Sequence, residues 1–171
     1  QLDCEITCVV SNHHDLRQAV ENFGVPFHQV TVSKDNKVEA EAEIQALVKD
    51  CDLLVLARYM QILSAEFTAA WHMKIINIHH SFLPAFVGAD PYRQAYEKGV
   101  KLIGATAHYV TADLDQGPII EQDVHRVSHR HHVAELRAIG QDVERSVLTR
   151  AVRWHLQNRV IVTGNKTVVF N

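Results

Sequence analysis

Continuous apolar runs, each followed by a segment of helix length, dominate the first half of this chain. The clearest run is Leu-Leu-Val-Leu at residues 53–56, which suits a strand covered on both faces. Strands are expected at residues 6–10, 27–32, 52–57 and 74–78, and helices at residues 14–23, 37–49 and 65–71. Alternation of this kind predicts parallel strands with helices on both faces of the sheet, which is an α/β fold.

The second half follows a different pattern. Residues 91–98 read as a short helix, residues 105–110 and 119–127 as longer strands, and residues 133–157 as a long helix. Five apolar residues of the long helix are spaced by three and four: Leu136, Ile139, Val143, Val147 and Ala151. The turn residues Gly164 and Asn165 separate two short apolar runs, so a terminal hairpin is expected.

Length, composition and charge exclude several classes of protein. The 171 residues are 47% hydrophobic and 22% charged, which fits one globular domain spanning residues 1–171. A formal net charge of −3 gives no electrostatic reason to expect nucleic acid or an anionic membrane as a partner. No apolar run approaches the roughly 20 residues that cross a bilayer. The three cysteines lack metal-type spacing, and reduced thiols in a cytoplasmic protein are expected.

Polar residues with catalytic potential follow the apolar pair at residues 75–76. Asn77 and His79 are two residues apart, so they share one face of a strand. An amide donor beside an imidazole provides the groups that polarise a carbonyl and move a proton. Because sites of parallel sheets lie at the carboxyl ends of strands, the loop at residues 57–63 should border the same pocket. The polar run at residues 111–118 offers Asp115 as a carboxylate for this place.

Each of these residues also has a purely structural interpretation. Asn77 and His79 could satisfy backbone groups at a strand end, and Asp115 could be a turn residue before Gly117 and Pro118. A metal site is a further alternative, since four histidines gather at positions 125, 129, 131 and 132. Their irregular spacing and the intervening arginines favour a solvated loop instead, and no metal ligand is predicted.

A family resemblance rests on four segments in this order and spacing: LARYMQILS, INIHHSFLPAFVGADPY, GATAHYV and ADLDQGPII. Together they resemble the formyltransferase-type catalytic domain, whose members handle 10-formyltetrahydrofolate. SNHHDL near the start and VTGNKTVVF at the end extend the resemblance over nearly the whole chain. It implies a three-layer, Rossmann-like formyltransferase fold, with a mostly parallel sheet and antiparallel C-terminal strands.

Within that family, His79-His80 followed by SFLP resembles the hydrolase branch, the formyltetrahydrofolate deformylases. The glycinamide ribonucleotide transformylases usually carry proline where His80 stands. The resemblance therefore implies hydrolysis of 10-formyltetrahydrofolate to tetrahydrofolate and formate. Two alternatives stay open: formyl transfer to an amine such as glycinamide ribonucleotide, and a non-catalytic folate-binding fragment. A metallohydrolase built on the histidines is a more distant one.

The resemblance also implies roles for single residues. Asn77 matches the amide that donates to the formyl oxygen, and His79 matches the general acid/base that protonates the departing N10 amine. Asp115 matches the carboxylate that orients His79 and holds the attacking water. His108 matches a further histidine beside the pocket, and His80 is expected to position the water or exclude an amine. Folate is the substrate, so no cofactor is expected.

The same resemblance implies two folate-binding loops. The backbone of the first receives the pterin ring, and the second faces it. The first loop comprises Met60, Gln61, Ile62 and Leu63, and the second comprises Thr111, Ala112, Asp113 and Leu114. The expected partners are 10-formyltetrahydrofolate, water and further copies of the same chain in a homo-oligomer.

The family pattern places one more strand and helix before the segment that starts near Leu2. That strand is central to the sheet in the family, and the deformylases also carry an amino-terminal regulatory domain. The chain is therefore expected to represent an amino-terminally incomplete catalytic domain, with the first strand and helix missing and the regulatory domain absent. Unpaired sheet edges would follow from a missing central strand.

Overall fold

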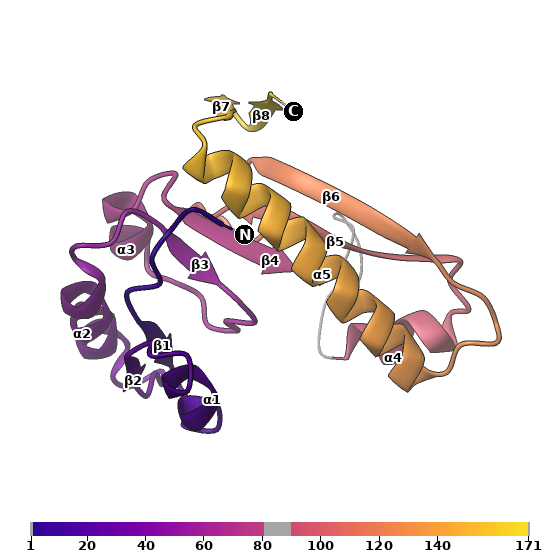
Figure 1. Cartoon of the computed structure of the whole chain (residues 1–171), viewed down its shortest axis with the longest axis horizontal. Coiled ribbons are helices and arrows are strands. Elements are labelled where there is room, and N and C mark those ends of the chain that lie inside the picture. The colour runs from indigo at the N-terminus through magenta and orange to yellow at the C-terminus, as the bar shows by residue number, and fades with distance from the viewer. Residues whose placement is uncertain (1, 81–89, 171) are drawn as a thin grey trace.

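The computed structural model describes residues 2–80 and 90–170 of the chain (Figure 1). The elements alternate between strands and helices in the first half and follow the predicted order throughout. They are β1 (Val9–Ser11), α1 (Arg17–Glu21), β2 (Phe27–Gln29), α2 (Lys37–Val48), β3 (Leu54–Leu56), α3 (Ala65–Ala70), β4 (Ile75–His79), α4 (Pro91–Glu97), β5 (Leu102–Tyr109), β6 (Ile119–Arg126), α5 (Val133–Leu156), β7 (Val160–Thr163) and β8 (Lys166–Val169).

The largest sheet has the strand order β3-β4-β5-β6. β3 and β4 run parallel, whereas β4 pairs antiparallel with β5 and β5 pairs antiparallel with β6. β1 and β2 form a parallel pair, and β7 and β8 form the predicted C-terminal hairpin. The parallel strands of the first half and the antiparallel strands of the second are thus both confirmed.

The long helix α5 lies across the face of β4 and β5 (Figure 1). Its predicted apolar stripe is confirmed, since Val143, Val147 and Ala151 pack against the sheet in one core cluster. Ile76 and Ile78 of β4 belong to the same cluster. Because strand side chains alternate between faces, Asn77 and His79 lie on the face of β4 away from α5.

A second apolar cluster holds the start of β4, the strand that carries Asn77 and His79. Phe67 and Trp71 pack with Ile75, the first residue of β4, and with Leu63. The expected helix at residues 65–71 is α3, and Ser64 caps it because the backbone N–H of Phe67 donates to its Oγ at 3.1 Å. The loop at residues 57–63 is therefore closed by a capped helix.

The expected strand at residues 6–10 begins later than predicted. β1 starts at Val9, where pairing with Phe27 of β2 starts, and Ile6 is 62% exposed. β5 begins earlier than predicted, at Leu102 instead of residue 105, because its pairing with β6 extends to Arg126. Both differences arise because partner strands, more than the apolar run itself, set the ends of a strand.

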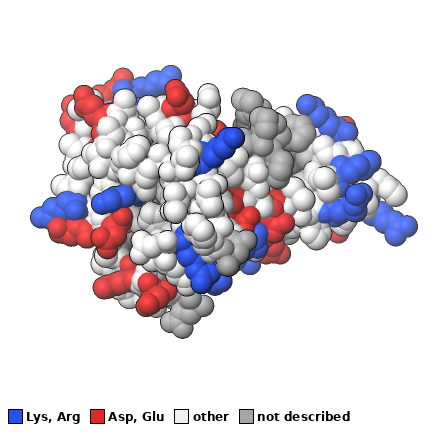
Figure 2. Space-filling model, turned by 90° about the horizontal axis from the view of Figure 1, so that it is seen from above, with Lys and Arg blue, Asp and Glu red and all other residues white. Residues whose placement is uncertain are grey.

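Surface charge is mixed in sign. Acidic and basic groups lie beside one another on the face that Figure 2 shows, in keeping with the small net charge. Among the described residues, none of the helices has both the length and the apolar character required to cross a membrane.

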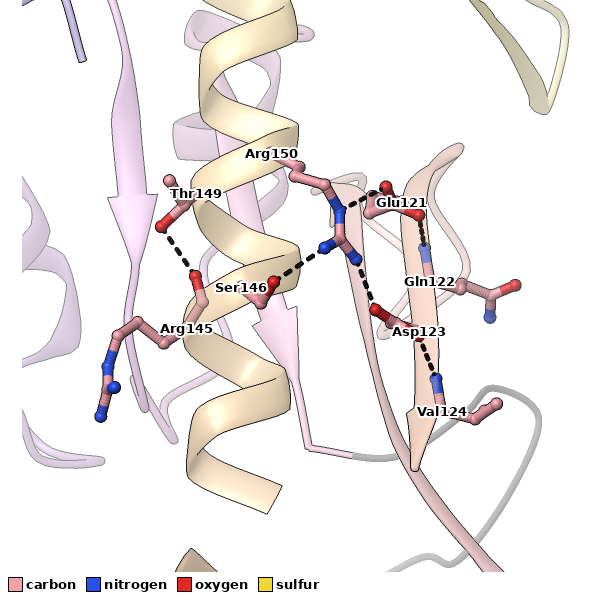
Figure 3. A network of polar contacts seen from close by, with 8 residues as sticks. All are labelled: Glu121, Gln122, Asp123, Val124, Arg145, Ser146, Thr149 and Arg150. Atoms are coloured by element: carbon pink, nitrogen blue, oxygen red, sulfur yellow. Dashed lines mark hydrogen bonds and ion pairs between the residues drawn. The ribbon is translucent and has the colours of Figure 1, made fainter. Parts of the chain in front are cut away.

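Arg150 ties α5 to β6, the last strand of the four-stranded sheet (Figure 3). Its Nε donates to Glu121 at 2.8 Å and one Nη donates to Asp123 at 2.8 Å, while the other Nη donates to Ser146 at 2.7 Å. The guanidinium holds the pKa of Asp123 below its usual range. Such a planar fork is suited to bridging two carboxylates and fixes the helix on the strand.

Gly140 of α5 lets Tyr92 of α4 lie directly on the helix. The Tyr92 side chain is buried, and a Cβ at position 140 would overlap the tyrosine ring. The Tyr92 hydroxyl donates to Glu144, and burial together with this carboxylate raises the pKa of Tyr92 well above its usual value. The glycine is therefore required by close approach of the two helices, although its backbone is helical.

We expect Gly140→Ala to destabilise the protein. Alanine gains about 1 kcal/mol of helix propensity, but overpacking against a buried ring costs about 1–3 kcal/mol. The cost of the overlap should exceed the gain in helix propensity, because Glu144 holds Tyr92 in place. The melting temperature should therefore fall by about 2–5 °C. Gln141→Ala, at an exposed neighbouring position, is the control. A Gly140→Ala protein that melts at or above the wild-type temperature would contradict this reading.

Candidate active site

The predicted polar residues meet where β4 and β5 run side by side. Asn77 and His79 are the third and fifth residues of β4. The β4–β5 register places His108 directly opposite Asn77 and Thr106 opposite His79. Residues opposite one another on antiparallel strands share a face, so three of the predicted side chains come from two adjacent strands. The shared face predicted for Asn77 and His79 is confirmed.

Asp115 reaches the same place from the loop between β5 and β6. Its Oδ2 lies 3.3 Å from Nδ1 of His79, and its Oδ1 lies 3.5 Å from Nε2 of His108. Asp115 adopts the left-handed conformation, with φ 55°, which aspartate tolerates better than most residues. One carboxylate therefore lies between two imidazoles.

His79 presents a free ring nitrogen to the site. Nδ1 donates to Asp115, so in the neutral imidazole Nε2 carries the lone pair. Within the described residues Nε2 is buried and has no hydrogen-bond partner. Burial lowers the pKa of His79 below its ordinary 6.5, Asp115 opposes this shift, and the neighbouring imidazoles of His80 and His108 add to it. The ring is thus held as a neutral base whose free nitrogen lacks a partner.

His108 is only 2% exposed, and its Nε2 lies near both the Asn77 amide and the Asp115 carboxylate. Its Nδ1 donates to the backbone carbonyl of Tyr109 at 2.9 Å, since a carbonyl only accepts. The neutral ring then accepts at Nε2, which lies 3.3 Å from Nδ2 of Asn77. An amide nitrogen carries two hydrogens, so this contact orients the Asn77 amide and leaves its second hydrogen available.

The chain returns to the site through a tight loop after β5. The backbone N–H of Tyr109 donates to the carbonyl of Pro118 at 2.9 Å, and a Cβ on Gly117 would overlap the Tyr109 carbonyl oxygen. The β5–β6 register shifts at residues 107 and 108, so Ile120 is the extra residue of a bulge. Bulges bend a strand and re-aim side chains, and this one lies at His108.

His80 stacks on His79, with ring centroids 5.0 Å apart and an interplanar angle of 16°. It is therefore next to the candidate base, as expected for a residue that influences the chemistry. The motif residues 81–84 that follow it lie outside the described residues. Asp90, further along the chain, is the N-cap of α4, and its carboxylate accepts from Arg93 and from Arg137, each at 3.2 Å.

The two expected folate loops present exposed apolar side chains. Met60 is 75% exposed and Ile62 is 58% exposed, whereas Leu63 is buried in the cluster of α3. In the second loop Leu114 is 62% exposed, and Thr111 Oγ1 donates to the carbonyl of Asp113 at 3.2 Å. In the described part of the chain, neither loop hydrogen-bonds to Asn77 or His79 through its side chains.

The histidines considered for a metal site do not gather around a common point. His131 accepts from the backbone N–H of Ser128 at 3.0 Å, within its own loop. Across residues 2–80 and 90–170, no group of three or more His, Cys, Asp or Glu side chains is arranged to hold a metal ion.

Glu41 of α2, which was not predicted as a site residue, lies beside the first of the two expected folate loops. It is only 7% exposed, and its carboxylate accepts from the backbone N–H of Ser64 at 2.9 Å. A signal was available, because Glu41 lies three residues before Ile44 and seven before Val48, on the apolar stripe of its helix.

Comparisons of sequence agree with one family. The family model described as Formyl transferase matches residues 1–152. The chain is 58% identical over 172 residues to a formyltetrahydrofolate deformylase of Bacillus subtilis, with 99% of this chain and 57% of that protein covered. The chain is also 49% identical over 170 residues to the formyltetrahydrofolate deformylase of an Escherichia coli O6:H1 strain, with 98% of this chain and 61% of that protein covered. The chain thus spans less than two thirds of the length of these relatives.

Solved structures give the same fold. A formyltetrahydrofolate deformylase from Pseudomonas syringae superposes with a TM-score of 0.94 at 56% identity, covering 99% of this chain and 58% of that one. A glycinamide ribonucleotide transformylase from Symbiobacterium toebii superposes with a TM-score of 0.88 at 30% identity, covering 99% and 82%. Both structures confirm the predicted α/β formyltransferase fold.

Proposed function

This chain belongs to the formyl transferase family, and from that premise we propose that it hydrolyses 10-formyltetrahydrofolate to tetrahydrofolate and formate. The observation that carries the proposal is the buried, unpartnered Nε2 of His79, on the strand face that also carries the Asn77 amide. A base and an oxyanion donor on one strand face are the groups that water needs to attack a formyl carbon. The relatives named deformylases favour water over an amine as the acceptor.

In the first step of the proposed reaction, water attacks the formyl carbon while His79 Nε2 takes a proton from it. Asp115 stabilises the imidazolium because its Oδ2 is 3.3 Å from Nδ1. Negative charge develops on the formyl oxygen, and the second amide hydrogen of Asn77 donates to it. His108 keeps that amide turned toward the substrate through the 3.3 Å contact at Nε2.

In the second step the tetrahedral intermediate collapses. The bond between the formyl carbon and N10 breaks, and His79 returns its proton to N10, which leaves as the amine of tetrahydrofolate. The other product is formic acid, which ionises to formate and releases one proton to solvent. The reaction consumes one water and needs no electron transfer, and we propose no cofactor for it.

The exposed apolar side chains of the two loops support a role in holding the pterin ring. We propose that the backbone at residues 60–63 binds the edge of the ring and that residues 111–114 close the pocket from the other side. His80 contacts the ring of His79 and would place the water or exclude a larger amine. Self-association and a cytoplasmic location remain predictions.

Formate release from 10-formyltetrahydrofolate, measured with chelator present and no amine added, tests the proposal. Turnover is expected from the wild-type chain and should fall by about 10²–10³-fold in Asn77→Ala. Formyl transfer is the runner-up function, which the transformylase likeness supports. It predicts no formate until glycinamide ribonucleotide is supplied. Tetrahydrofolate binding without turnover under either condition would instead support a folate-binding fragment.

The pH dependence of kcat/KM should show an acid limb with a midpoint below 6.5. The rate requires neutral His79, and burial lowers the pKa of this ring, so activity should persist until the pH falls through the lowered value. His80 is one of the groups that lower the pKa of His79, so His80→Gln should move the midpoint of the acid limb up toward pH 6.5. His72→Gln, at an exposed position outside the site, is the control. A wild-type limb at or above 6.5 would argue against His79 as the base.

A further inference from the structure

We propose that Glu41 is a positioning residue for the first folate loop, residues 60–63, and sets the affinity for folate. The inference rests on the proposed function, because it assigns a purpose to the anchoring of a loop that would bind the pterin ring. Glu41 touches none of the reacting groups. It acts through the backbone of Ser64, the residue that follows the loop.

The burial of Glu41 calls for an explanation. Its side chain is 7% exposed, and Ala40 and Val48 of the same helix are also buried. A carboxylate removed from water is unfavourable unless hydrogen bonds or charges compensate it. The Ser64 N–H donates to Oε1 at 2.9 Å, and Nζ of Lys37 lies 3.9 Å from the same oxygen. A charge-assisted hydrogen bond of this kind is stronger than a neutral one and fixes the backbone that it binds.

Helix capping alone does not account for the contact. Ser64 already caps α3 with its own hydroxyl, which accepts from Phe67 N–H. In a capping box, the residue that binds the N-cap backbone N–H is a glutamate or glutamine three positions later. Position 67 is phenylalanine here, so Glu41 supplies this carboxylate from another helix, 23 residues earlier. The bond therefore joins the end of the loop to α2.

The loop is fixed at both ends and exposed in the middle. At its start, Leu56 pairs with Asn77 of β4, and Arg58 adopts the left-handed conformation with φ 59°. Tyr59 packs against the apolar cluster that contains Phe67 and Trp71 of the α3 region. Burial, and to a smaller extent the charge of Glu41, raise the pKa of Tyr59. Met60 and Ile62 point to solvent between these anchors. A loop held in its binding conformation loses less entropy when a ligand binds.

The test compares Glu41→Ala with Glu41→Gln and with Glu43→Ala, an exposed glutamate on the same helix. Measurements are the Kd for tetrahydrofolate, the KM and kcat for 10-formyltetrahydrofolate, and the melting temperature. Glu41→Ala should raise Kd and KM about fivefold or more while kcat at saturation stays within twofold. Glu41→Gln keeps an oxygen that accepts from Ser64 N–H and should restore most of the affinity. Glu43→Ala should resemble the wild type.

Equal Kd and KM in Glu41→Ala and Glu43→Ala, with wild-type turnover intact, would overturn this inference alone. A wild type that neither binds tetrahydrofolate nor releases formate would overturn the proposed function and this inference with it. If Glu41→Ala does not fold, Ser64→Pro removes the donor, and the φ of −68° at Ser64 suits proline. Ser64→Ala, which removes only the cap hydroxyl, is its control. Ser64→Pro should raise Kd further than Ser64→Ala, and equal values would overturn the inference.

Discussion

Replacing His79 with alanine should lower kcat for formate release by about 10²–10⁴-fold, the range typical of a positioned general acid/base. The reason is that, among the buried side chains that the structure describes, His79 Nε2 is the one basic nitrogen without a hydrogen-bond partner, and it lies on the strand face that carries the Asn77 amide. Asp115→Ala should also abolish most turnover, because it removes the carboxylate that orients His79. Single-turnover measurements with 10-formyltetrahydrofolate would report the chemical step directly.

The binding of folate separates this prediction from unfolding. Both variants should keep the Kd for tetrahydrofolate within severalfold of the wild type, because neither residue belongs to the pterin loops. His72→Ala, at an exposed position, should leave kcat unchanged. A His79→Ala protein with a near-normal rate would remove His79 from the mechanism.

Replacing Asn77 with alanine should reduce kcat by about 10²–10³-fold, which corresponds to about 3 kcal/mol of transition-state stabilisation. The loss reflects the donor that faces the formyl oxygen as charge develops there. Asn77→Asp separates loss of the hydrogen-bond donor from loss of side-chain volume, since aspartate has nearly the same size but an ionised carboxylate cannot donate. We expect Asn77→Asp to be no better than Asn77→Ala.

The contribution of His108 appears in a double-mutant cycle with Asn77. If His108 acts by orienting the amide, His108→Ala should slow the wild type but add little to the loss in Asn77→Ala. Additive losses in the double variant would mean that His108 acts separately, for example through Asp115. Melting temperatures of all three variants provide the control, because His108 is buried.

Much of the site could be predicted because it follows from periodicity. Residues two apart on a strand share a face, so Asn77 and His79 had to point together, away from Ile76 and Ile78. The polar run at residues 111–118 offered Asp115 and the family resemblance added His108, and the structure places the two within 3.5 Å of one another. Local patterns of this kind persist because burial of one strand face permits a single register.

Other features depend on contacts between distant segments and were out of reach. The start of β1 follows its pairing with β2, so the apolar residue Ile6 remained outside the strand. The burial of Glu41 follows from its place on the helix, but its partner Ser64 does not, because the two meet only once α2 packs beside the loop before α3. The protonated nitrogen of His108 is likewise set by a backbone carbonyl at the turn of β5. Propensity describes a segment by itself, and these properties arise from its neighbours.

The loop between β5 and β6 is closed by the Tyr109–Pro118 backbone hydrogen bond, and Gly117 fits only because it has no side chain. The number of residues between these points is therefore as important as their identity. Removing or inserting one residue would either move Asp115 away from His79 or shift the β5–β6 pairing by one residue, which would turn the side chains of β6 to the opposite face. Through evolution, this loop should accept substitutions at exposed positions such as Gln116 while its length stays constant.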